Sequence, residues 1–162
     1  MVKRNPSVEI YAREINNEVT LALFLRAQIY GCHYEKSSRL PDALYFAPHF
    51  GQRIARNHPG VQVGISYIAS IERVEVIETW EDFLQRVGEI KNKQWLNNNF
   101  DEFLRPLRKN WNWHQTKRYF VFLSKPRLVF NPPVLKLKLQ KGKGFLGEHY
   151  FSFERLFAAW GC

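Results

Sequence analysis

Residues 61–77 read VQVGISYIASIERVEVI, and this stretch decides the class of fold. The segment is dense in β-branched residues, which favour strands, and its side chains alternate between two faces. One face of the expected strand carries Ile65, Tyr67, Ala69 and Ile71. The pattern restarts at Val74 and Val76, which predicts one long strand with a bulge near Glu72 and Arg73.

The segments around this strand predict an α+β fold. We expect helical residues over 17–30 and 79–105, strands over 43–47, 118–124, 128–130 and 134–139, and a short closing helix after Ser152. Gly31 is the expected stop of the first helix, and Pro48 is the expected end of the first strand. Because helices and strands do not alternate regularly, a doubly wound parallel sheet does not fit. We expect a single domain over 1–162, built on a curled mixed β-sheet or a small β-barrel with flanking helices, with a helical insertion at about 79–105.

The positive charge of the chain is placed unevenly. The whole chain carries a formal net charge of +9 over 162 residues, yet residues 103–147 contain no Asp or Glu and eleven Lys and Arg. A strongly basic face favours a polyanionic partner, of which nucleic acid is the first candidate, before an anionic membrane or an acidic protein. A basic protein with merely solvated lysines is the alternative that composition alone leaves open.

Two tryptophans lie inside this acid-free segment. Residues 110–115 read NWNWHQ, so Trp111 and Trp113 alternate with amide side chains between two basic clusters. An unstacked base needs an aromatic plane and polar groups for its edge, and Trp with Asn supplies both. The alternative is that one ring packs in the core and the other covers the sheet.

Lysines also mark the far end of the segment. In the strand expected over 134–139, leucines face the core and lysines face solvent, and the glycines that follow let a backbone approach closely. A solvated edge strand protected by lysines is the alternative. The expected nucleic-acid contacts are Arg105, Arg108, Lys109, Trp111, Trp113, Lys117, Arg118, Lys136, Lys138, Lys141 and Lys143.

No recognised catalytic motif occurs in the chain. Asp42, Glu89 and Lys91 have the order of the acidic and lysine residues in restriction-type nucleases, but that motif needs its second acid on a strand, and Glu89 lies in a segment expected to be helical. The five histidines have no standard spacing for a zinc site, so we expect neither a metal nor a cofactor. We therefore expect a protein that is not an enzyme, with a small nuclease as the enzymatic alternative.

The cysteines and the N-terminal residues indicate the cellular compartment of the protein. Cys32 and Cys162 are too far apart in the sequence to indicate a disulfide framework, and the first residues lack the apolar run of a signal peptide. No stretch is long and apolar enough to span a bilayer. We expect a cytoplasmic protein that has no membrane among its partners. The sequence does not predict its oligomeric state.

Three segments resemble the PUA-like superfamily, which includes the ASCH, EVE and YTH domains. These are LYFAPHFG at 44–51, GISYIASIERVEVI at 64–77 and YFVFLSKPRLV at 119–129. The resemblance implies a small β-barrel that binds RNA or DNA and reads a flipped or modified base. It implies a base pocket near the start of the strand at 64–70, with these candidates: Ser66, Tyr67, and Trp111 or Trp113 as a wall. The helical insertion departs from the family pattern, and no aromatic cage is recognisable.

These observations lead to a main hypothesis, a nucleic-acid-binding domain with a basic face and tryptophan stacking. Two alternatives remain open. One is a small nuclease or nucleic-acid-modifying enzyme. The other is a protein-interaction module, for instance of a defence system, whose basic face docks an acidic partner.

Overall fold

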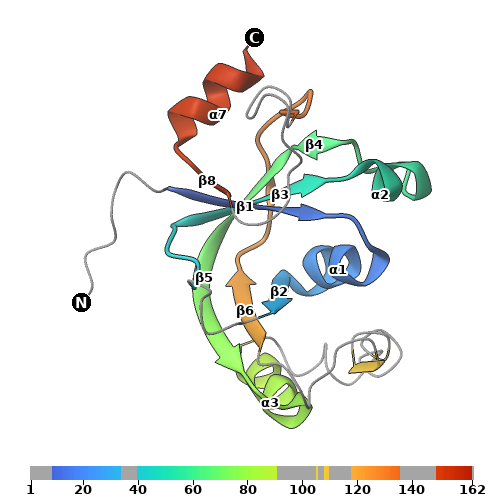
Figure 1. Cartoon of the computed structure of the whole chain (residues 1–162), viewed down its shortest axis with the longest axis vertical. Coiled ribbons are helices and arrows are strands. Elements are labelled where there is room, and N and C mark those ends of the chain that lie inside the picture. Colours follow the sequence, from blue (N-terminus) through green and yellow to red (C-terminus); the bar gives the residue numbers. More distant parts are fainter. Residues whose placement is uncertain are drawn as a thin grey trace.

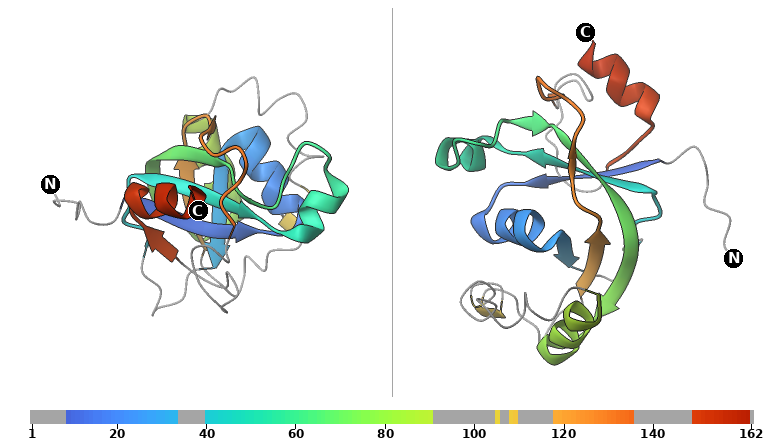
Figure 2. Two further views of the ribbon diagram at one scale, coloured as in Figure 1. Left: turned by 90° about the horizontal axis from the view of Figure 1, so that it is seen from above. Right: turned by 180° about the vertical axis from the view of Figure 1, so that it is seen from behind.

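The computed structural model describes residues 9–33, 40–90, 105, 108–109, 118–135 and 149–161. These residues form a curled, mixed β-sheet with helices packed around it (Figure 1). The view from behind shows helix α7 (Phe153–Trp160) and helix α3 (Trp80–Ile90) near opposite ends of the molecule (Figure 2, right). The predicted α+β fold class is confirmed.

The sheet is mixed because it combines one parallel pairing with several antiparallel ones. The strands are β1 (Ile10–Ile15), β2 (Ile29–His33), β3 (Tyr45–Phe50), β4 (Gly64–Ile65), β5 (Tyr67–Ile77), β6 (Arg118–Leu123), β7 (Arg127–Leu128) and β8 (His149–Phe151). Their order is β2-β6-β5-β3-β1-β8, with β4 on β3 and β7 on β5. Strands β1 and β3 run parallel, and the other pairings are antiparallel.

Strand β5 is shared between two parts of the sheet. Its first residues pair with β7 and β3, and from Ile71 onward it pairs with β6. The register shifts between Ile71 and Arg73, so the predicted bulge is confirmed. A bulge bends a strand and increases its twist, and β5 curves along the length of the sheet (Figure 1).

The prediction that Ile65 shares a strand face with Tyr67 is wrong. The expected strand is interrupted at Ser66, so that Gly64 and Ile65 form β4 on strand β3. Ile65 therefore packs with Ile68 in one core cluster, whereas Tyr67 belongs to another.

The predicted end of the first strand at Pro48 is also wrong, because β3 continues to Phe50. Strand β3 pairs with β5 at its start and with β4 at its end, and Pro48 lies between these two antiparallel partners. The ladder is interrupted on this side of β3, whereas the parallel pairing with β1 continues past Pro48, so a residue without an N–H is tolerated.

The first helix ends earlier than predicted. Helix α1 (Glu18–Ala22) is capped by the side chain of Asn17 and continues as the π-helical stretch η1 (Leu23–Ala27). Gln28 then adopts a left-handed conformation with a φ of 53°, and β2 follows at once. The predicted stop at Gly31 is therefore wrong, because Gly31 lies within β2.

The other described helices include α2 (Gln52–Asn57), α3 and α7. The Asp82 N–H donates to the Thr79 hydroxyl at the start of α3, which lies within the segment predicted to be helical. The Arg155 N–H donates to the Ser152 hydroxyl, so the predicted closing helix is confirmed with its cap.

Strand β6 carries the core on both of its faces, and all six of its residues are buried. Tyr119, Val121 and Leu123 face the cluster inside the curl of the sheet. Phe120 and Phe122 face the opposite cluster, where helix α3 and η1 cover the sheet. This two-sided cover explains why RYFVFL reads as an unbroken apolar run after its first residue.

Side chains connect β1 to β2, two strands that share no backbone pairing in the described sheet. The Arg13 Nε donates to the Tyr30 hydroxyl at 3.1 Å, and its Nη2 donates to the Cys32 sulfur at 3.1 Å. The hydroxyls of Tyr11 and Tyr119 share a buried hydrogen bond of 2.7 Å between β1 and β6. The curl is therefore held together on this side by polar side chains.

Arg13 keeps its charge in this setting. Burial by itself would lower the pKa of Arg13, but the neighbouring Tyr30, Tyr11 and Cys32 raise it above its ordinary value. Burial, followed by the interaction with Tyr11, raises the pKa of Tyr119. The hydroxyl of Tyr119 consequently remains protonated as a hydrogen-bonding group.

The first prediction concerns Arg13. We expect Arg13→Met to lower the free energy of unfolding by about 1–3 kcal/mol, because two hydrogen bonds from a charged donor are lost. Arg53→Met, at an exposed position of α2, is the control and should stay within about 0.5 kcal/mol of the parent. Denaturant titration measures both, and equal stability of the two variants would contradict a role of Arg13 in holding β1 to β2.

The second prediction concerns Gly64, whose φ is 114°. A Cβ at this position would lie 2.7 Å from the Val134 carbonyl oxygen and 2.8 Å from the Pro133 Cβ. We expect Gly64→Ala to lower the free energy of unfolding by about 1–3 kcal/mol or more. Two effects add, namely backbone strain at the positive φ and steric overlap of the new Cβ with its neighbours. Gly60→Ala is the matched control, since a Cβ there meets nothing within 4 Å. Thermal unfolding midpoints that are equal for the two variants would contradict this account of Gly64.

Candidate functional site

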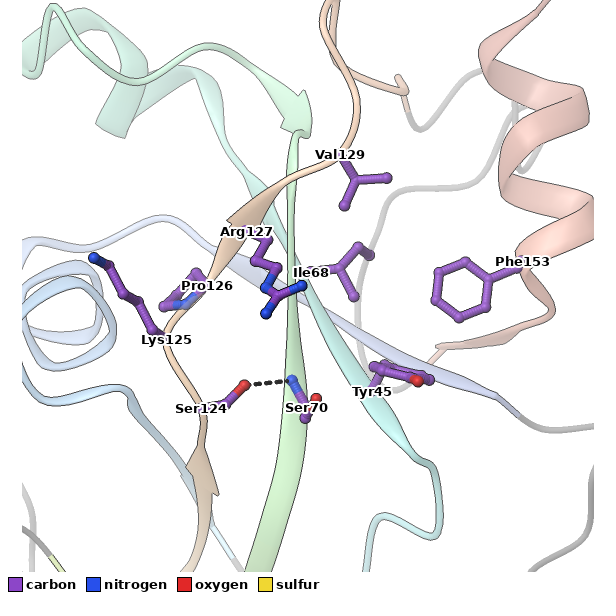
Figure 3. A pocket seen from close by; sticks show the side chains of 9 residues that line it. All are labelled: Tyr45, Ile68, Ser70, Ser124, Lys125, Pro126, Arg127, Val129 and Phe153. Atoms are coloured by element: carbon purple, nitrogen blue, oxygen red, sulfur yellow. Dashed lines mark hydrogen bonds between the residues drawn. The ribbon is translucent and has the colours of Figure 1, made fainter.

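The larger of two pockets beside β7 has a volume of about 750 Å³. It is open to solvent at the place where β3, β5 and the start of α7 come together (Figure 3). The residues that line it are Tyr45, Ile68, Ser70, Ser124, Lys125, Pro126, Arg127, Val129 and Phe153.

The path of the chain after β6 creates this pocket. At Ser124 the chain leaves β6 and is tied to β5, because the Ser70 N–H donates to the Ser124 hydroxyl at 2.9 Å and the Ser124 N–H donates to the Ser70 carbonyl at 3.0 Å. After Pro126 the chain returns to β5, where Arg127 pairs with Ile68. The dashed line in Figure 3 marks the bond between the two serines.

Two aromatic rings form one wall of the larger pocket. The ring centroids of Tyr45 and Phe153 lie 5.1 Å apart at an interplanar angle of 70°. Glu9 positions both residues, because its carbonyl accepts from the Tyr45 N–H at 2.9 Å and its carboxylate accepts from the Phe153 N–H at 3.0 Å. The wall thus unites strand β3 with the first residue of helix α7.

The opposite side of the larger pocket carries positive charge. Lys125 and Arg127 are both exposed, and no carboxylate within the described ranges forms an ion pair with either. The side chain of Arg127 extends beside Ile68 toward Ser70, whereas Lys125 extends away from the two rings (Figure 3). Neither residue was among the expected contacts, although both lie in the acid-free segment and flank Pro126 shortly after a strand.

The smaller pocket has a volume of about 290 Å³ and contains the predicted base-pocket residues Ser66 and Tyr67. Its other lining residues are Pro59, Gly60, Gln62, Leu128, Phe130 and Asn131. Ser66 is buried, and its carbonyl accepts from the N–H groups of Val129 and Phe130. Binding of a base by Ser66 and Tyr67 stays a prediction.

Three predicted phosphate contacts are exposed in the structure, namely Arg105, Arg108 and Lys109. The guanidinium of Arg108 lies over the Trp80 ring, 5.9 Å from its centroid. The remaining predicted contacts, other than Arg118, lie outside the described residues: Trp111, Trp113, Lys117, Lys136, Lys138, Lys141 and Lys143.

Arg118 occupies a different environment from the one expected of a phosphate contact. Only 2% of this residue is exposed, because β6 is covered on both faces. Burial lowers the pKa of Arg118, and the nearby Cys32 partly opposes that shift. We therefore leave Arg118 out of the interface proposed below.

The residues considered for a nuclease do not gather into a metal site in the described structure. Asp42 is exposed shortly before β3, and Lys91 lies outside the described residues. Glu89 lies on helix α3, where its two carboxylate oxygens accept hydrogen bonds from Gln85 and Arg86. Within the described ranges, no three or more His, Cys, Asp or Glu side chains are arranged to hold a metal ion.

No helix in the described part of the chain is long and apolar enough to cross a membrane.

Comparisons with known proteins identify the fold. No family model matches the chain. No curated protein matches it either. Among solved structures, a serine-to-alanine mutant of the ASCH protein from Zymomonas mobilis matches with a TM-score of 0.52 at 9% identity, over 95% of this chain and 96% of that one. A tyrosine-to-phenylalanine mutant of the same protein matches with a TM-score of 0.50 at 8% identity, over 93% and 95%. The chain therefore shares the fold of these ASCH structures.

Proposed function

We propose that the chain binds nucleic acid and holds an unpaired base against the rings of Tyr45 and Phe153. The observation that carries this proposal is the combination in one pocket of an aromatic wall, serine hydroxyls and an exposed arginine. A nucleotide needs these groups together, because its base stacks, its base edge and sugar form hydrogen bonds, and its phosphate attracts a cation. A pocket of about 750 Å³ is well within the range of small-molecule sites.

The distribution of charge supports the same partner. The acid-free segment 103–147 supplies Arg127 at the pocket and the exposed Arg105, Arg108 and Lys109 elsewhere. A strand that reaches from the pocket along such residues would be held by phosphate contacts, and binding would weaken as salt concentration rises. An acidic protein would also be attracted, but its carboxylates carry no attached flat ring, whereas each nucleotide joins a phosphate to a base that can stack on the aromatic wall.

An unpaired base is the form of nucleic acid that suits this pocket. A base stacked within a duplex cannot reach the Tyr45 ring, so binding requires a single strand or a flipped nucleotide. The resemblance to the PUA-like superfamily supports RNA or DNA as the partner. Reading of a modified base, with Trp111 or Trp113 as a further wall, belongs to the same proposal and is tested by including methylated oligonucleotides.

The third prediction concerns the cations at the larger pocket. We expect the double variant Lys125→Glu and Arg127→Glu to weaken binding of single-stranded oligonucleotides, and to make the slope of log K against log salt shallower by about 1.4, at about 0.7 for each lost phosphate contact. Arg53→Glu with Arg56→Glu, on the exposed side of α2, changes the net charge equally and is the matched control. Fluorescence anisotropy over a salt series measures both. A slope near zero for the parent protein, or equal losses in both double variants, would contradict the proposal.

The fourth prediction separates stacking from charge. We expect Tyr45→Leu to weaken binding of a single strand about tenfold or more, because stacking of a base on an aromatic ring contributes about 1–3 kcal/mol. Tyr45→Phe keeps the ring and should stay close to the parent, and neither variant should change the salt slope. If Tyr45→Leu binds as tightly as Tyr45→Phe, then the ring of Tyr45 does not stack on a base.

The same binding reactions test the nuclease alternative when their products are separated by length. Labelled RNA and DNA are incubated with and without Mg²⁺. Cleavage that depends on Mg²⁺ and is lost in Asp42→Asn or Glu89→Gln would favour a nuclease over a binding protein. Unchanged substrate length with saturable binding supports the proposal.

A further inference from the structure

The two pockets lie on the two faces of one narrow ribbon. This ribbon consists of β7 and the first residues of β5, with Tyr67 opposite Leu128 and Ile68 opposite Arg127. Successive side chains of a strand point to opposite faces. Ile68 and Arg127 accordingly line the larger pocket, whereas Tyr67 and Leu128 line the smaller one.

The outer edge of this ribbon is open to a ligand. Within the described ranges, β7 pairs with β5 on one side and with no strand on the other. Leu128 is 58% exposed, and Arg127 beside it is also exposed. A chain that passes over this edge meets a cation and an apolar side chain, which suit a phosphate and a sugar or base respectively.

The smaller pocket has the groups that a second base requires. Tyr67 provides a half-buried ring, and the exposed Gln62 and Asn131 provide amides that can form hydrogen bonds with a base edge. Its volume of about 290 Å³ is just below the range of about 300–1,000 Å³ for small-molecule sites, so it fits one base better than a whole nucleotide.

We infer that the two pockets hold two consecutive nucleotides of a single strand whose backbone crosses the edge of β7. This inference rests on the proposed function and adds the unit of recognition, which is a dinucleotide step rather than a single base. One base stacks at Tyr45, the linking phosphate meets Arg127, and the next base enters the pocket at Tyr67. A duplex is rejected at both positions, because neither base can stay paired.

Gly60 offers a way to close the smaller pocket without disturbing the fold. It lines that pocket, and a Cβ placed on it meets nothing within 4 Å. Gly60→Leu therefore adds a side chain to the lining of the smaller pocket, and Gly60 does not line the larger one. Gly161→Leu is the matched control, because it adds the same side chain at the end of α7, where the nearest atom is an ordinary 3.5 Å away.

The experiment compares ligands of increasing length on the full chain. Ribonucleoside 5′-monophosphates, 5′-phosphorylated dinucleotides and hexanucleotides, in RNA and DNA forms, are titrated against the parent, Gly60→Leu, Gly161→Leu and Tyr45→Leu. We expect dinucleotides to bind about tenfold more tightly than mononucleotides, and Gly60→Leu to remove that gain while mononucleotide binding stays unchanged. Tyr45→Leu should weaken both ligands, and Gly161→Leu neither. Circular dichroism and thermal midpoints check that each variant is folded.

The outcomes separate this inference from the proposed function. If mononucleotides and dinucleotides bind equally, or if Gly60→Leu binds dinucleotides like the parent, the two-pocket inference is overturned while nucleic-acid binding stands. If hexanucleotides also fail to bind the parent protein, the proposed function itself is overturned.

Discussion

The fold depends on the change of partners along strand β5. One continuous strand pairs with β3 and β7 in its first part and with β6 from Ile71 onward. The bulge at that point bends the strand, so that it can pair with both sets of neighbours. Because β6 is buried on both faces, its position fixes the cluster inside the curl as well as the one under helix α3. The pocket depends on the same point, since the chain leaves β6 at Ser124 opposite Ser70, just before the bulge.

The larger pocket is assembled from segments that are far apart in the sequence. Glu9, at the start of the described chain, binds the N–H of Tyr45 through its carbonyl and the N–H of Phe153 through its carboxylate. One residue thereby sets the distance between the two rings that form the aromatic wall. Both rings lie on residues whose N–H groups are held by Glu9, so the position of the aromatic wall is fixed by backbone hydrogen bonds.

Sequence patterns located several elements correctly for reasons that are local. The bulge followed from an interrupted alternation, and the closing helix followed from an apolar segment after Ser152. The errors came from contacts that no local pattern reveals: the stop at Gln28 instead of Gly31, the passage of β3 through Pro48, and the break at Ser66 that turns Ile65 to another cluster. The resemblance to the PUA-like superfamily led to the prediction of a base pocket at Ser66 and Tyr67; both residues line the smaller pocket, and binding of a base there stays a prediction. The larger pocket was missed, although two cations around Pro126 directly after a strand were a signal for it.

The sequence by itself determined the class of fold, the long bulged strand and the excess of positive charge in one segment, because alternation, caps and charge are properties of neighbouring residues. Only the tertiary structure decided which of those charges reach solvent. Arg118 and Arg127 look alike in the sequence, but β6 is covered on both faces while β7 lies beside an opening, so one guanidinium is buried and the other is exposed. Exposure and pocket shape depend on what packs against a residue from distant parts of the chain, and no local pattern contains that information.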